Sequence, residues 1–213
     1  MGANDGDTDA FDWEKPAHEV TLSSYSIGQT EVTQALWVAV MGSNPSYFTS
    51  ANGYTDDLNR PVECVSWDDC QTFIHKLNQI TGRQFRLPTE AEWEFAARGR
   101  NKSLIYKYSG SNNIENVAWY YGNSDEITHK VSAKAPNDLS LYDMSGNVWE
   151  WCQDNWSIYS NSSQTNPTGP STGSYRICRG GSWYNDAKYC RVSYRDNSYP
   201  TDTFNDLGLR LAL

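Results

Sequence analysis

The stretch DMSGNVWEW occupies residues 143–151, and from Val148 to Cys152 it alternates as a β-strand does. Its two tryptophans belong to an unusual composition, because 213 residues contain nine tryptophans and 14 tyrosines. Aliphatic side chains are scarce, so aromatic rings must fill much of the core. Since buried indole and phenol groups need hydrogen-bond partners, this composition predicts an irregular, hydrogen-bonded interior.

Upstream of this stretch, hydrophobic spacing and capping residues predict three short helices, at residues 33–41, 66–80 and 89–98. Ser66 with Asp69, and Thr89 with Glu92, have the spacing of a capping box. Downstream, the helical pattern disappears, and short strands are predicted at residues 148–152, 176–179, 191–195 and 207–213. Two polar segments, residues 1–14 and 158–174, are expected to be mobile.

The charge of the chain excludes some partners. The formal net charge is −9, and a protein that binds nucleic acid needs a basic surface to face the phosphates. No apolar run is long enough to span a bilayer, so no membrane insertion by this chain is expected. The first residues are acidic and polar, unlike a signal peptide.

Four further motifs accompany the opening stretch in a fixed order: GQTEVT (28–33), PVECVSW (61–67), RLPTEAEWE (86–94) and RGGSW (179–183). Together, from about residue 14 to Leu213, the five motifs resemble the formylglycine-generating enzyme family, also called sulfatase-modifying factors. The resemblance implies one domain over residues 1–213, with an α+β, C-type-lectin-like fold and little regular secondary structure.

The same resemblance bears on the start of the chain. Members of the family usually have a strand before the position that Met1 holds here. An N-terminal strand, and with it any export or anchoring segment, is therefore expected to be missing from this sequence. Such a segment would place the protein at a cell surface or on a phage particle.

Enzymes of this family oxidise a cysteine of a sulfatase to formylglycine with oxygen and copper. The resemblance places their two copper-binding cysteines a few residues after a Gly-Gly-Ser-aromatic motif. Cys190 matches the second cysteine, whereas Asn185 stands at the first. Because thiolates suit copper(I) and an amide does not, copper is not expected and the chain is predicted not to be an enzyme. A formylglycine-generating-type copper oxidase that uses Cys190 remains an alternative.

The segment 184–206 is built mainly from Asn, Asp, Tyr, Ser, Thr and Phe. An asparagine codon AAC becomes a codon for each of the other five by changes at its adenines alone. In this alphabet and in its C-terminal place, the segment resembles the variable region of a diversity-generating retroelement target, where a reverse transcriptase mutates adenines. The resemblance implies a non-catalytic protein that binds or displays ligands through a diversified surface. An ordinary polar loop and a divergent carbohydrate-binding module are the alternatives.

The candidate ligand-binding residues share this alphabet: Tyr184, Asn185, Asp186, Tyr189, Tyr194, Asp196, Asn197, Ser198, Tyr199, Thr201, Asp202, Thr203, Phe204, Asn205 and Asp206. Tyrosine supplies rigid contact area, and serine, asparagine and aspartate supply adaptable hydrogen bonds, as in an antibody paratope. The expected partner is a protein or a glycan.

A cation site is also predicted, from residues that match a calcium position of the family: Asp143, Gly146, Val148 and Glu150. Two carboxylates and two backbone carbonyls are the hard oxygen ligands that calcium takes, so a structural calcium or magnesium ion is expected. The alternative is that Asp143 and Glu150 cap turns.

Three arginines recur at strand-like positions near the C-terminus: Arg191, Arg195 and Arg210. They are expected to hold the C-terminal segment through hydrogen bonds to backbone carbonyls or carboxylates. Glu31, Glu90 and Glu92 lie near predicted helix starts and are interpreted as caps that complement the helix dipole.

Overall fold

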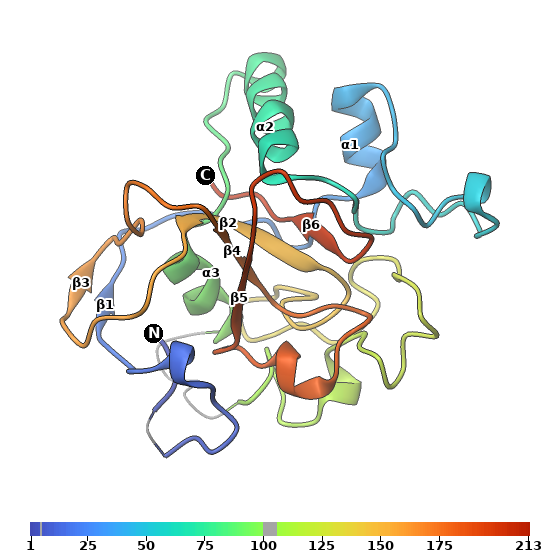
Figure 1. Cartoon of the computed structure of the whole chain (residues 1–213). Coiled ribbons are helices and arrows are strands. Elements are labelled where there is room, and N and C mark those ends of the chain that lie inside the picture. The colour runs from blue at the N-terminus through green and yellow to red at the C-terminus, as the bar shows by residue number, and fades with distance from the viewer. Residues whose placement is uncertain (5, 100–105) are drawn as a thin grey trace.

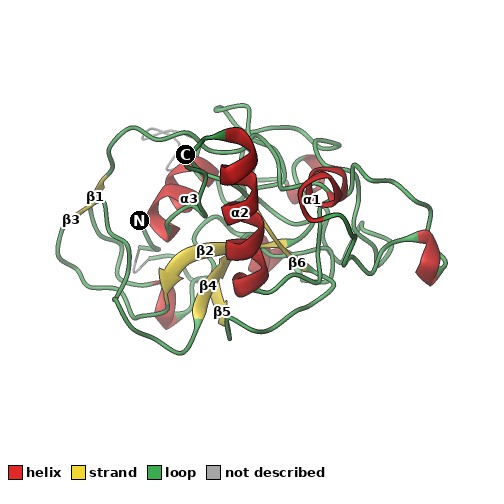
Figure 2. Cartoon of the chain, turned by 90° about the horizontal axis from the view of Figure 1, so that it is seen from above, coloured by secondary structure: helices red, strands yellow, loops and turns green. Residues whose placement is uncertain are grey.

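A computed structural model describes residues 1–4, 6–99 and 106–213 of the chain. Figure 2 shows that most of this part is loop, around three α-helices: α1 (Gln34–Met41), α2 (Trp67–Thr81) and α3 (Glu90–Ala97). The predicted α+β fold with little regular secondary structure is confirmed. None of the described helices is both long and apolar enough to cross a membrane.

The helices begin and end as the capping residues predict. Ser66 and Asp69 exchange hydrogen bonds at the start of α2, and Thr89 and Glu92 do the same at the start of α3. A glycine in the left-handed conformation follows each of α1 and α2: Gly42 and Gly82. These ends depend only on residues within one turn, which explains why the sequence located them.

A four-stranded sheet crosses the centre of the molecule in the order β5-β4-β2-β6 (Figure 1). Its strands are β2 (Trp149–Asn155), β4 (Arg176–Arg179), β5 (Arg195–Ser198) and β6 (Leu207–Leu209). β6 runs parallel to β2, and the other neighbours are antiparallel. A separate parallel pair joins β1 (Val20–Thr21) to β3 (Gln164–Thr165).

Three strand predictions were wrong in their limits, and the one for residues 148–152 continues to Asn155 as β2. Residues 191–194 are not in a strand: they follow a 3₁₀ turn (Ala187–Cys190), and β5 begins only at Arg195. Residues 191–195 are all buried, so they do not show the alternation of a half-exposed strand. The last strand, β6, ends at Leu209, after which Ala212 makes isolated bridges to Ile27 and Arg86.

One face of the sheet is defined by the pairing register. Trp151, Cys178 and Asp196 lie in one row across β2, β4 and β5, and Trp149 lies opposite Leu207. Because side chains alternate along a strand, all five project from the same face.

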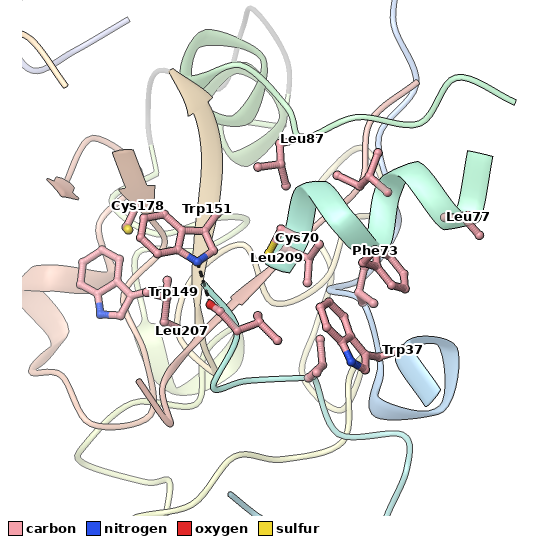
Figure 3. Close-up of a cluster of buried hydrophobic side chains, with 14 of the residues drawn as sticks. Trp37, Cys70, Phe73, Leu77, Leu87, Trp149, Trp151, Cys178, Leu207 and Leu209 are labelled. Atoms are coloured by element: carbon pink, nitrogen blue, oxygen red, sulfur yellow. Dashed lines mark hydrogen bonds between the residues drawn. The ribbon is translucent and has the colours of Figure 1, made fainter. Parts of the chain in front are cut away.

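The helix α2 covers part of this face. Its buried Cys70 and Phe73 belong to the same hydrophobic cluster as Trp151 and Leu209 (Figure 3). The indole N–H of Trp151 donates to the Val65 carbonyl at 3.0 Å, as the predicted hydrogen-bonded interior requires.

The helix α3 packs on the opposite face, where Trp93 and Ala96 meet Cys152 and Ile177. The Trp93 indole donates to Glu150 Oε2 at 2.6 Å, so this core also contains a hydrogen-bonded aromatic ring. The sheet is therefore covered by one helix on each face.

Parts of the N-terminal segment, which was expected to be mobile, pack against the domain. The Gly2 N–H donates to Glu94 Oε1 at 2.8 Å, and the Ala3 N–H donates to the Glu14 carbonyl at 2.8 Å. Glu14 itself is completely buried. Gly2 and Glu14 thus contact residues far along the chain, which composition does not reveal.

Candidate ligand-binding surface

Buried ion pairs hold the segment 184–206 against the domain. Arg191 donates to both carboxylate oxygens of Glu14, at 2.8 and 2.6 Å. Arg195 donates to both oxygens of Glu90, at 2.7 Å each. Two-point pairs of this kind fix both position and orientation. The role predicted for these arginines is confirmed, and the carboxylates reach them from the N-terminal segment and from α3.

The third arginine, Arg210, forms a similar buried ion pair, with Glu150 as its partner. Arg210 Nη2 donates to Glu150 Oε1 at 2.7 Å, and its Nε lies within 3.1 Å of both Glu150 oxygens. The sequence did not reveal a fourth buried arginine, Arg179, which pairs with Glu94.

Two of the glutamates interpreted as caps have other roles. The Glu90 side chain faces Arg195 instead of the helix end. Glu31 is buried before α1, where it accepts hydrogen bonds from Asn147 Nδ2 at 2.8 Å and from the Val148 N–H at 3.2 Å. Only Glu92 acts as the predicted cap, because its carboxylate accepts from the Thr89 N–H at 2.8 Å.

The outer side of the same segment is exposed. Tyr184, Tyr199 and Phe204 have 63, 50 and 48% of their surface exposed. Four further candidates are exposed: Asp186, Asp196, Thr201 and Thr203. The half-buried candidates are Asn185, Tyr189, Asn197, Ser198, Asp202, Asn205 and Asp206. We call these fourteen residues the outer surface.

One candidate does not belong to it. Tyr194 is only 5% exposed and lies in the hydrophobic cluster with Trp149. Its ring meets Phe11 and Tyr189 edge-on, at centroid distances of 5.6 and 5.1 Å. The prediction that Tyr194 contacts a ligand was therefore wrong, because the N-terminal segment covers it.

Ser182 connects the two ends of the outer surface. Its hydroxyl oxygen lies 2.7 Å from Asn185 Oδ1 and 2.8 Å from Asp206 Oδ2. One residue outside the predicted segment extends the surface: the Tyr175 hydroxyl donates to the Tyr199 hydroxyl at 2.9 Å, with ring centroids 4.5 Å apart. Nothing in the sequence around Tyr175, which directly precedes the predicted strand 176–179, indicated that it pairs with Tyr199.

A small pocket of about 190 Å³ opens on this surface at the edge strand β5. Its floor consists of Trp149, Cys178 and Leu207, and its walls consist of Asp196, Asn197, Ser198, Phe204 and Asp206. We call it the edge pocket. All five wall residues are sequence-predicted candidates, whereas the floor residues are framework that the sequence did not assign to a site. Two larger hollows, of about 610 and 370 Å³, are lined mainly by residues outside 184–206.

The predicted cation site is partly occupied by protein groups. Both Glu150 oxygens accept hydrogen bonds from Arg210, and Trp93 also donates to one of them. Asp143 Oδ2 accepts from the Ser132 N–H at 2.7 Å, whereas its buried Oδ1 has no hydrogen-bond partner in the described structure. Burial raises the pKa of the Asp143 carboxyl to about 6.

Within residues 1–4, 6–99 and 106–213, no group of three or more His, Cys, Asp or Glu side chains is arranged to hold a metal. A cation at this place would have to rely on Asp143 Oδ1 and backbone carbonyls such as those of Gly146 and Val148, because Arg210 neutralises Glu150. The calcium or magnesium ion stays a prediction.

Comparison with known proteins identifies the framework. Residues 1–213 match the family described as sulfatase-modifying factor enzyme 1-like domain. The chain belongs to this family. The resemblance that the five sequence motifs indicated is thereby confirmed.

Relatives within this sulfatase-modifying factor family carry several names. Treponema denticola variable protein 1, a solved structure, superimposes with a TM-score of 0.89 and 39% identity, covering 99% of this chain and 90% of that one. Chaperone protein LppX of Paenibacillus barcinonensis is 34% identical, over 90% of this chain and 81% of its own. The formylglycine-generating enzyme of Thermomonospora curvata is 33% identical, over 97% of this chain and 73% of its own.

The positions that the family resemblance assigns to a copper-binding pair are Asn185 and Cys190. Asn185 Oδ1 accepts the Ser182 hydroxyl, and Cys190 is completely buried beside Tyr108 and Val117. Burial raises the pKa of the Cys190 thiol to about 12, and Asn185 supplies an amide in place of the second thiolate that copper(I) favours. The residues of this chain therefore do not fit a copper centre of the kind implied by the family.

Proposed function

We propose that this sulfatase-modifying factor-like domain is a non-catalytic binding protein whose outer surface is diversified by a retroelement. One observation carries the proposal. Within the segment 184–206, the Asn, Asp, Tyr, Ser, Thr and Phe residues lie on the outer surface, except Ser193 and Tyr194. In the same segment, Cys190, Arg191, Val192 and Arg195 are buried. Substitution can therefore change the surface and leave the scaffold in place.

Two further observations support it. The high similarity to Treponema denticola variable protein 1 associates this framework with a variable protein. The outer surface combines exposed Tyr184, Tyr199 and Phe204 with aspartates, asparagines and threonines, which is the chemistry of a protein-binding paratope. A protein or a glycan is the class of partner that such a surface suits, and export would present it at a cell surface or on a phage particle.

Randomising the outer surface tests the proposal. We expect that a library with the AAC-derived alphabet at Tyr184, Asp186, Tyr199, Thr201 and Thr203 keeps the fold in most members, since exposed substitutions usually change stability by less than about 0.5 kcal/mol. Protease resistance of the displayed library measures the folded fraction. Selection of the same library against unrelated proteins should yield binders.

The matched control library varies Arg191, Val192 and Arg195 with the same alphabet, and it should lose most folded members. Near the gene, a reverse transcriptase and a near-repeat of the segment should be present, and the near-repeat should have adenine-rich codons such as AAC at the positions of the exposed residues. Equal intolerance in the two libraries, or the absence of both gene features, would contradict the proposal.

The proposed function and the copper-oxidase alternative predict opposite results for copper binding and peptide oxidation, and we expect both activities to be absent. Purified protein should bind no stoichiometric copper(I) and should form no aldehyde on a Cys-x-Pro-x-Arg peptide, because Asn185 replaces one thiolate and the Cys190 thiol is buried. Mass spectrometry of the peptide, with the formylglycine-generating enzyme of Thermomonospora curvata as positive control, gives the readout. Aldehyde formation by this chain would establish it as an oxidase.

A further inference from the structure

The edge pocket lies where α2 no longer covers the sheet. Its floor residues Trp149, Cys178 and Leu207 project from the same face as Trp151 and Leu209, and they belong to the same hydrophobic cluster. Figure 3 shows Trp149, Leu207 and Cys178 at the end of this cluster away from α2. The pocket is thus an opening into the apolar core from the outer surface.

The pocket wall is acidic. Asp196 and Asp206 line it, and none of the residues that line it is a lysine or an arginine. Burial raises the pKa of both carboxyl groups, and no cation is among the groups that offset this effect. Asp196 is exposed and Asp206 is half-buried, and among the described residues neither forms an ion pair, so both carboxylates can accept hydrogen bonds from a cationic ligand.

The size of the pocket limits the ligand. A volume of about 190 Å³ is below the roughly 300 Å³ at which sites for drug-sized ligands begin, so it suits a single side chain. An apolar floor, an aromatic wall at Phe204 and acidic groups at the rim complement a long apolar stem with a cationic head. Arginine combines such a stem with a planar head that stacks on aromatic rings and donates to carboxylates in pairs.

We propose that the edge pocket binds an arginine side chain presented by a protein partner, held between Asp196, Asp206 and Phe204. This inference rests on the proposed binding function and specifies the partner's chemistry for this particular sequence. Arginine and tyrosine are common hot spots of protein interfaces, and exposed Tyr199 directly follows the wall residue Ser198. The net charge of −9 favours encounter with such a basic partner.

The test is a titration of the whole chain with Nα-acetyl-arginine amide, followed by NMR. We expect saturable shifts of the Trp149 indole and of the β5 amides, with a Kd in the millimolar range, as about −4 kcal/mol corresponds to 1 mM. The citrulline analogue has the same shape without the charge and should bind at least about ten-fold more weakly. D196N should weaken arginine binding by a similar factor, whereas D138N, at an exposed aspartate outside the pocket, should leave it unchanged.

Equal binding of arginine and citrulline, or shifts that avoid the pocket residues, would overturn the inference. The citrulline comparison uses the unaltered chain, so it remains decisive even if D196N fails to fold. The two proposals can fail independently. If the pocket binds citrulline as well as arginine, the inference about arginine fails and the library result is unaffected. If the randomised library loses most folded members, the diversified surface is contradicted, whatever the pocket binds.

Discussion

Replacing Glu150 by glutamine lowers the free energy of unfolding by about 3–5 kcal/mol, because it leaves the buried Arg210 without its counter-charge. Both residues are completely buried, and the Trp93 indole shares the same carboxylate. Chemical denaturation of E150Q and the parent chain measures the difference.

The matched control is E126Q, which makes the same change at an exposed glutamate. Its free energy of unfolding should lie within about 0.5 kcal/mol of the parent. A loss in E150Q no larger than the loss in E126Q would mean that Arg210 does not depend on Glu150.

Replacing Tyr194 by alanine should destabilise the protein by about 3 kcal/mol or more, because it empties a position in the core cluster next to Trp149 and Phe11. Tyr184 provides the matched comparison, since it is the same residue type in the same segment but 63% exposed. Y184A should change the free energy of unfolding by less than about 0.5 kcal/mol. Thermal and chemical unfolding of both variants measure the contrast.

Similar losses in the two variants would remove the distinction between framework and outer surface, on which the proposed function depends. The expected contrast would instead show that one amino-acid alphabet serves two purposes within 23 positions of chain, residues 184–206. It would also identify Tyr194 as a position where most substitutions destabilise the fold.

The helices and the family were accessible from the sequence because their signals are local. Ser66 and Asp69 are three residues apart, so their spacing alone fixes the start of α2. The strand predicted at 191–195 was wrong because the signal there is not local. Arg191 is buried and pairs with Glu14, which lies 177 residues away in the sequence. Because arginine is usually exposed, an alternating pattern that contains it predicts a half-exposed strand, and the sequence does not show that the arginine is paired and buried.

The sequence by itself determined the family, the helix limits, the aromatic and hydrogen-bonded character of the core, and the alphabet of residues 184–206. Only the tertiary structure decided which residues of that alphabet face outward, since Tyr194 and Tyr184 are chemically identical and differ only in what covers them. It also brought Trp149, Cys178 and Asp196 together in the edge pocket. The physical reason is that capping acts within one helical turn, whereas burial and pocket shape depend on strands and ion pairs between residues far apart in the chain.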